Sequence, residues 1–139
     1  MLDDRGNTAV YLLYAYARIR SICRTAGISR QQIIEYAEKL PDGDLPLEHD
    51  AEYKLAKTIL KFSDCILMVL DSLFLHQLCD YVYSLATTFH DFYNDCYVIH
   101  KDREGNTTIY YHRLVLCQVT ADIMERCLQI LGISTVQRM

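Results

Sequence analysis

With 139 residues, 51% of them hydrophobic, the chain has the size and composition of one globular domain spanning residues 1–139, and not of a linker or disordered tail. Its most apolar run, Cys65–Leu75, contains an aspartate and is too short to cross a bilayer, so we expect no membrane partner. The formal net charge of −4 argues mildly against nucleic acid, but residues 1–30 carry +3, residues 31–100 carry −8 and residues 101–139 carry +1. If the terminal helices pack side by side, one surface can still attract a polyanion.

The sequence contains no pattern that predicts catalysis or a bound cofactor. Six cysteines are scattered without a Cys-x-x-Cys pair, which is typical of reduced, mostly buried thiols in a cytoplasmic protein. His76 and Cys79 share a helix face, but a buried cysteine beside a partly exposed histidine explains them better than a metal site does. Phosphate-binding loops and nucleophile motifs are absent. We therefore assign no catalytic, cofactor-binding or metal-binding residue, and we do not expect this chain alone to be an enzyme.

Helical periodicity and capping signals predict two helices in the first third of the chain. The first starts at Asn7 or Thr8, which can act as its N-cap, and runs to about residue 26, before a glycine. Ser29 followed three residues later by Gln32 is a capping box that opens a short helix, RQQIIEYAEKL. The next segment, PDGDLP, has the residues of a loop.

The middle of the chain predicts further helices. Asp50 is the expected N-cap of the next helix, and Ser63 either caps a fresh helix or marks a kink. The run CILMVLD is apolar on nearly every side, which is typical of the middle of a core. Helical spacing of apolar residues continues from about residue 75 to residue 95.

The last third leaves one local alternative open. The segments CYVIH and TIYYH are rich in strand-forming residues and flank KDREGN, so a hairpin is one interpretation. We favour a polar loop followed by a helix from Thr108, because the helical periodicity continues unbroken to Leu131. The predicted fold is all-α, an antiparallel bundle of five to six helices joined by short loops.

Tyrosine is the most unusual feature of the composition, with eleven tyrosines and no tryptophan. Tyr11, Tyr14 and Arg18 are spaced i, i+3, i+7 and share one helix face. A second cluster, FHDFYNDCYV, lies near a helix end. Half-exposed rings with nearby arginines suit the stacking of unpaired bases, whereas buried rings serve a core. The nearby arginines are Arg18, Arg20 and Arg24. The pattern alone leaves the base-stacking and core interpretations about equal.

Three motifs resemble a known family. GNTAVYLLYAYARIRSI resembles the segment that follows the catalytic domain in arginyl-tRNA synthetases. LATTFHDFYNDCYVI resembles the Phe-Tyr-x-x-Cys-x-Val stretch of that family, and HRLVLCQVTADIMERCLQILGISTVQRM resembles its final helix and terminal Arg-Met. The motifs occur in the family's order across residues 3–139, and the eukaryotic cytosolic form is the most similar.

The resemblance implies a helical anticodon-binding domain of the DALR type that binds the anticodon loop of tRNA(Arg). It implies a parent enzyme that attaches arginine to this tRNA with ATP and Mg2+, with the catalytic domain of the same chain as a further partner. The signatures of that catalytic domain are absent from this sequence, and no cofactor is implied for this part. The alternative is a helical protein-interaction module that joins other synthetases in a larger assembly.

The resemblance also implies which residues approach the anticodon loop. Tyr11 and Tyr14 lie in the first-helix motif, and one of them can pack beneath the other and hold it in place. The phenylalanine–tyrosine motif contributes two more aromatic residues, and the tail ends on a methionine, in STVQRM, where many family members have Pro-Glu-Arg-Met. The predicted anticodon-binding residues are Tyr11, Tyr14, Arg18, Tyr93, Tyr97 and Met139.

Overall fold

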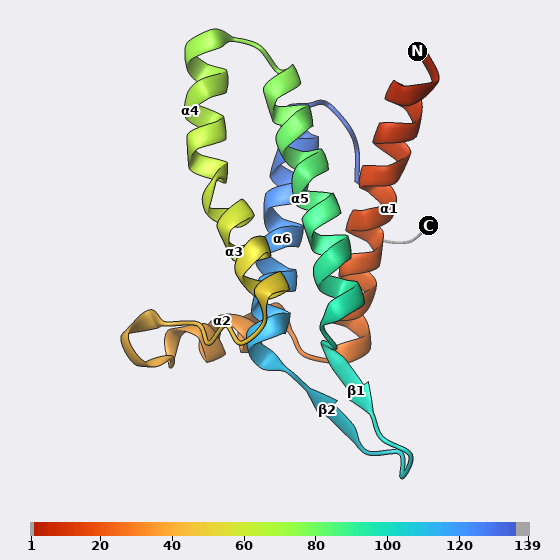
Figure 1. The fold of residues 1–139 in the computed structure, drawn as a ribbon, viewed down its shortest axis with the longest axis vertical. Coiled ribbons are helices and arrows are strands. Elements are labelled where there is room, and N and C mark those ends of the chain that lie inside the picture. Colours follow the sequence, from red (N-terminus) through yellow and green to blue (C-terminus); the bar gives the residue numbers. More distant parts are fainter. Residues whose placement is uncertain (1, 136–139) are drawn as a thin grey trace.

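The computed structural model describes the backbone of residues 2–135 and the side chains of residues 8–135. The predicted all-α bundle is confirmed, with one small hairpin added (Figure 1). The elements in chain order are α1 (Leu2–Ala26), α2 (Arg30–Glu38), the 3-10 turn η1 (Pro41–Gly43), α3 (Asp50–Leu60), α4 (Phe62–Ser72), α5 (His76–Asp95), β1 (Ile99–Lys101), β2 (Thr107–Ile109) and α6 (Tyr111–Ile130).

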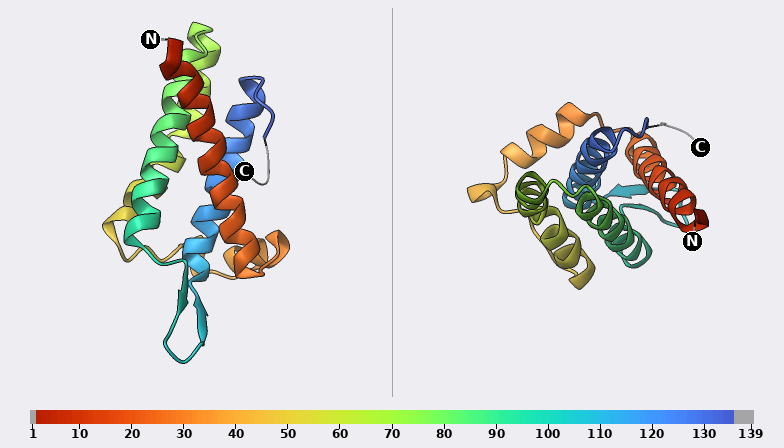
Figure 2. Two further views of the ribbon diagram at one scale, coloured as in Figure 1. Left: turned by 90° about the vertical axis from the view of Figure 1, so that its right-hand side faces the viewer. Right: turned by 90° about the horizontal axis from the view of Figure 1, so that it is seen from above.

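Helix α6 lies at the centre of the bundle. It packs against α1, α2, α3 and α5, and it runs antiparallel to α1 and α5 (Figures 1 and 2). Helices α3 and α4 follow one another along the side of α5 that faces away from α1, and α2 lies across one end of the bundle (Figure 2). Because α6 has several neighbouring helices, it buries nine residues over a broad face, including Leu116, Cys117, Thr120 and Met124.

Helix starts agree only partly with the sequence-based prediction. The capping box of Ser29 and Gln32 is confirmed, with both reciprocal hydrogen bonds present. The predicted start of α1 at residue 7 or 8 is wrong, since the helix already begins at Leu2. Two acidic residues follow Leu2 directly in the sequence, and negative charge in a first turn favours a helix start.

The N-cap of α3 also differs from the prediction. It is His49 and not Asp50, because the His49 Nδ1 accepts a hydrogen bond from the backbone N–H of Ala51 at 3.1 Å. Glu52 completes this capping box from the helix side. The predicted break near Ser63 falls at Lys61, where α3 ends and α4 begins at Phe62.

The apolar run of α4 does not form the middle of the core, contrary to the prediction. Within α4 only Cys65 is buried, whereas Leu67 and Leu70 are 64% and 67% exposed. Helix α4 packs mainly against α5 at the edge of the bundle, so only one of its faces has neighbours (Figure 1). The prediction that a helix apolar on all sides lies at the centre of the bundle was therefore wrong for α4. The central helix is α6.

The hairpin that the sequence left as the less favoured alternative is present. Strands β1 and β2 pair antiparallel, with Ile99 opposite Ile109, and project from the end of the bundle (Figure 1). The turn is closed by the Asp102 carboxylate, which accepts hydrogen bonds from the backbone of Glu104 and Asn106, while Gly105 adopts φ 87°. The last helix accordingly begins at Tyr111 and not at Thr108.

The cysteines fit the prediction of buried thiols. All six are free, and all but Cys79 are buried. Burial raises the pKa of Cys127 to about 12 and that of Cys117 well above its ordinary value, which keeps both thiols protonated and unreactive. Among the described residues, no helix combines the length and apolarity that a membrane span requires.

Candidate functional site

An open groove lies between α1, the end of α5 and strand β1. Its volume is about 1200 Å³. The groove brings together two segments that lie far apart in the sequence, residues 14–25 and residues 93–101, both of which carry predicted site residues. Its lining consists of Tyr14, Ala17, Arg18, Ser21, Ile22, Arg24, Thr25, Tyr93, Asn94, Cys96, Tyr97, Val98, Ile99 and Lys101.

Arg18 joins the tyrosines of the two segments. Its Nη1 donates a hydrogen bond to the Tyr14 hydroxyl at 3.3 Å, and its guanidinium carbon lies 4.8 Å from the centre of the Tyr93 ring. Hydrogen bonding to Tyr14, and then to Tyr93, raises the pKa of Arg18 above its ordinary value, so the guanidinium stays charged at any physiological pH. The cation is held by the Tyr14 hydroxyl and the Tyr93 ring while remaining exposed to solvent.

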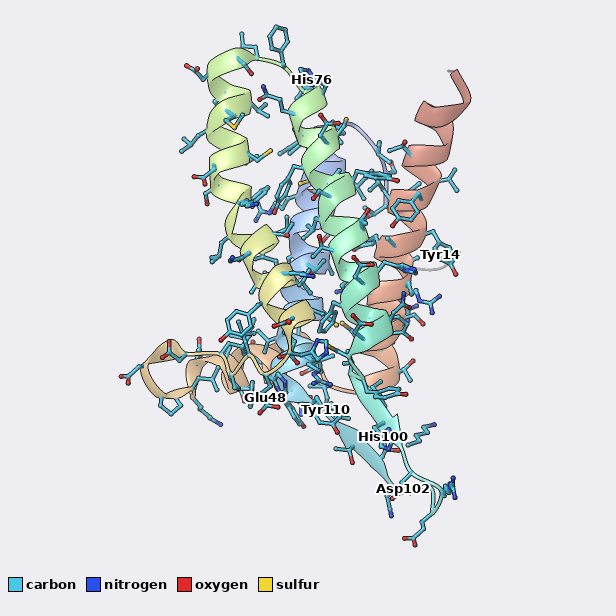
Figure 3. The ribbon with its side chains drawn as sticks, viewed as in Figure 1. Tyr14, Glu48, His76, His100, Asp102 and Tyr110 are labelled. Carbon is cyan, nitrogen blue, oxygen red and sulfur yellow. The ribbon has the colours of Figure 1, made fainter. Side chains whose placement is uncertain are left out.

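The tyrosines of the groove differ in exposure. Tyr14 is 53% exposed and projects outward from α1 (Figure 3). Tyr97 is 69% exposed and meets the His100 ring edge-on, with the ring centres 5.5 Å apart. Tyr93 is half-buried and stacks on the buried Phe89. Tyr14 and Tyr97 are therefore the exposed rings of the groove, and Tyr93 is a half-buried part of its lining.

Tyr11 lies outside the groove lining. Its half-buried ring packs against Tyr83 of α5, with the ring centres 5.3 Å apart. Tyr14 is therefore the exposed ring of the first-helix pair, and Tyr11 belongs to the packing of α1 on α5. Met139 lies outside the described residues.

Several polar groove residues, including Lys101, Asn94 and Arg24, were missing from the predicted site. Lys101 was assigned to a polar loop, and the hairpin brings it to the groove instead. The strand-forming residues around KDREGN were the signal that could have placed it. Asn94, one residue after Tyr93, also lines the groove, as does Arg24, which was considered only as a general phosphate contact. Arg20, considered with it, does not line the groove.

The groove has the electrostatics of an anion-binding surface. Arg18, Arg24 and Lys101 are its charged residues, and no acidic side chain occurs among the described residues that line it. Positive charge beside exposed aromatic faces is the combination that holds unpaired nucleic-acid bases together with their phosphates. Within residues 8–135, no group of three or more His, Cys, Asp or Glu side chains is arranged to hold a metal ion.

Comparison with known proteins identifies relatives that match the whole chain. The chain is 55% identical over its whole length to a probable cytoplasmic arginine–tRNA ligase of Caenorhabditis elegans, covering 19% of that protein. It is 50% identical to the cytoplasmic arginine–tRNA ligase of Xenopus tropicalis, covering all of this chain and 21% of that protein. The chain thus spans about a fifth of the length of these curated relatives.

The fold matches solved structures of similar proteins. An arginyl-tRNA synthetase of Plasmodium falciparum superposes with a TM-score of 0.72 at 32% identity, over 94% of this chain and 21% of that chain. A putative arginyl-tRNA synthetase of Campylobacter jejuni gives 0.76 at 25% identity, over 96% of this chain and 27% of that chain. The model of the DALR anticodon binding domain matches residues 12–139, and the chain therefore belongs to that family.

Proposed function

We propose that this chain recognises the anticodon loop of tRNA(Arg) through the groove between α1, α5 and β1. The observation that carries the proposal is the grouping of Tyr14, Arg18 and Tyr97: two exposed rings and a fixed cation line one groove, and none of its described lining residues is acidic. Membership of the family and similarity to arginine–tRNA ligases support it.

In the proposed complex, bases of the loop leave their stack and lie on tyrosine faces. Each such contact is worth about 1–3 kcal/mol. Arg18, Arg24 and Lys101 neutralise phosphates, and the Asn94 amide offers both a donor and an acceptor to a base edge. Tyr93 supports Arg18 from the groove wall. Tyr11 stabilises the packing of α1 on α5. Met139 remains a proposed contact between the C-terminal tail and the anticodon loop.

The proposal extends to the parent protein. It is an arginine–tRNA ligase of the cytoplasm, in which ATP and Mg2+ serve a catalytic domain outside this sequence. The supporting observation is the identity to two much longer ligases, both of which are described as cytoplasmic. This domain then contributes tRNA selection and not chemistry.

Binding of anticodon stem-loops to the 139-residue chain tests the proposal. A stem-loop with an arginine anticodon should bind more tightly than one in which the middle anticodon base is changed. With three cations in the groove, the logarithm of affinity should fall with the logarithm of salt concentration with a slope of about −2. Equal binding of both loops, or no binding, would contradict the proposal.

A pair of tyrosine variants locates the binding surface. Tyr97→Ala should weaken binding by about 1–3 kcal/mol, as expected for the loss of one stacking ring. Tyr53→Ala is the matched control, because Tyr53 is 53% exposed but lies on α3, outside the groove lining. If the two variants lose affinity equally, the groove is not the site.

One observation favours the alternative of a protein-interaction module. Leu67, Met68, Leu70, Leu73 and Phe74 are exposed along α4 and the turn that follows it, and exposed apolar clusters mark interaction surfaces. Replacing Leu67 and Leu70 with glutamine separates the two functions. The proposed RNA-binding role predicts unchanged stem-loop affinity, whereas an interaction module predicts lost association with a partner synthetase.

A further inference from the structure

A buried ion pair lies beside the groove but outside its lining. Glu52, in the first turn of α3, is fully buried, and its Oε1 accepts a hydrogen bond from the Nε of Arg113 in α6. The Nε2 of His112 lies 3.3 Å from the same oxygen. A buried charge of this kind is costly unless it is fully hydrogen-bonded, so its place in the fold requires an explanation.

Glu52 is fixed independently of Arg113. Its other oxygen, Oε2, accepts hydrogen bonds from the backbone N–H groups of Glu48 at 2.6 Å and His49 at 3.2 Å, which form part of the α3 capping box. Burial acts to raise the pKa of Glu52, but the Glu48 donor, Arg113 and the His49 donor outweigh it and hold the pKa below its ordinary value. The carboxylate is thus a charged anchor set by the start of α3.

Arg113 extends from this anchor to the groove. Its Nη1 donates a hydrogen bond to the backbone carbonyl of Tyr97 at 2.8 Å, and its guanidinium carbon lies 4.8 Å from the centre of the Tyr110 ring. The rigid, planar fork of arginine makes two such bonds in a fixed relative geometry, which the single ammonium group of lysine does not reproduce.

Tyr97 needs such support because of where it lies in the chain. Helix α5 ends at Asp95, so Tyr97 is no longer held by helical hydrogen bonds. Its ring is 69% exposed and meets the edge of the His100 ring, itself an exposed residue. The neighbouring carbonyl of Val98 accepts a hydrogen bond from the N–H of Tyr110 at 3.0 Å. The direction of the Tyr97 ring is thus set through its backbone.

We propose that Arg113 is a positioning residue for RNA binding: it fixes the Tyr97 platform to the buried carboxylate of Glu52 without contacting RNA itself. This inference rests on the proposed function of the groove. It assigns α3 and α6, which contribute no residue to the groove lining, a role in the affinity of the groove.

A double-mutant cycle distinguishes positioning from a general structural role. Arg113→Lys keeps a charged partner for Glu52 and loses the fork. It should weaken stem-loop binding by on the order of fivefold when Tyr97 is present, and by less than about twofold in the Tyr97→Ala background. Its effect on thermal stability should be the same in both backgrounds. Arg30→Lys is the matched control, because Arg30 also forms a long-range ion pair, with Asp122, outside the groove lining.

Equal weakening in both backgrounds would overturn the proposal, because Arg113 would then act independently of Tyr97. A second measurement needs neither RNA nor a variant. In the wild-type chain, the guanidinium protons of Arg113 should exchange slowly with water and show nuclear Overhauser contacts to Tyr97 and Val98. Their absence would also overturn it. If the wild-type chain binds no stem-loop, the proposed function fails, and the proton measurement still decides whether Arg113 holds Tyr97.

Discussion

One residue type takes three different roles in this molecule. Tyr16 is 3% exposed and part of the core, Tyr81 is half-buried with its hydroxyl bonded, and Tyr14 and Tyr97 present open faces. Sequence spacing put Tyr11, Tyr14 and Arg18 on one helix face but left open which rings are exposed. Exposure depends on the neighbouring helix: Tyr83 of α5 covers part of Tyr11 and does not reach Tyr14. The residue types of the site were thus predictable, whereas their separate roles required the packing of α1 on α5.

The two tyrosines of α1 should respond oppositely to truncation. Tyr14→Ala removes an exposed ring and the acceptor for Arg18, so it should weaken stem-loop binding by about 1–2 kcal/mol and leave the melting temperature nearly unchanged. Tyr11→Ala removes a ring packed on Tyr83, so it should lower the melting temperature and change binding less. Fluorescence anisotropy and thermal melts on the same samples measure both effects. The reverse ranking would contradict the assignment of Tyr14 as the platform.

At the scale of elements, capping and loop residues predicted well which segments are helical, but they predicted poorly where each helix lies in the bundle. The capping box of Ser29 and the loop after α2 follow from short-range chemistry, and both are present. The exposed position of α4 does not follow from its sequence, because the number of neighbours around a helix is a tertiary property. The hairpin was missed for a related reason. Helical periodicity is real from Tyr111 onward, but the turn at Asp102 and Gly105 pairs the preceding residues instead.

The junction of α3 with α4 supplies a prediction about packing. The Tyr81 hydroxyl of α5 donates a hydrogen bond to the Thr58 carbonyl at 2.8 Å, near the point where α3 ends. Burial raises the pKa of Tyr81 far above its ordinary value, so this donor stays protonated. Tyr81→Phe should lower the free energy of unfolding by about 1 kcal/mol, seen as a lower urea midpoint at an unchanged slope.

Tyr83→Phe is the control for that measurement. Tyr83 lies on the same helix and is 47% exposed, and its ring contact with Tyr11 does not need the hydroxyl. Its urea midpoint should match the wild type. An equal shift in both variants would show that the hydroxyl of Tyr81 has no specific role at the junction.

Across the whole molecule, the uneven charge of the sequence becomes a local surface. The condition that the terminal helices pack side by side is met, since α1 lies against α6. The basic groove nevertheless forms between α1 and β1, with Arg18 and Arg24 from one and Lys101 from the other. The net charges of the separate segments indicated that a chain with a net negative charge can still carry a basic surface. Its location depended on the long-range contacts that bring the end of α5 and the start of β1 next to the second half of α1.

Acid should unfold the molecule partly through Glu52. Its folded-state pKa lies below the ordinary value, so the folded state favours the charged carboxylate. This stabilisation is fully present above the unfolded-state pKa of about 4.3, and it is lost as the pH falls toward the lower folded-state pKa.

The variant Glu52→Gln tests this, because its side chain cannot titrate and leaves Arg113 without its charged partner. The wild type should therefore be the more stable protein at pH 5, and its advantage should shrink steadily between pH 5 and pH 2. Urea unfolding of both proteins across that range measures the difference between their free energies of unfolding. Titrating groups that both proteins share cancel in this difference; one of them is Asp102, whose own pKa is lowered. A constant difference would show that the Glu52 carboxylate is not the group whose protonation destabilises the fold.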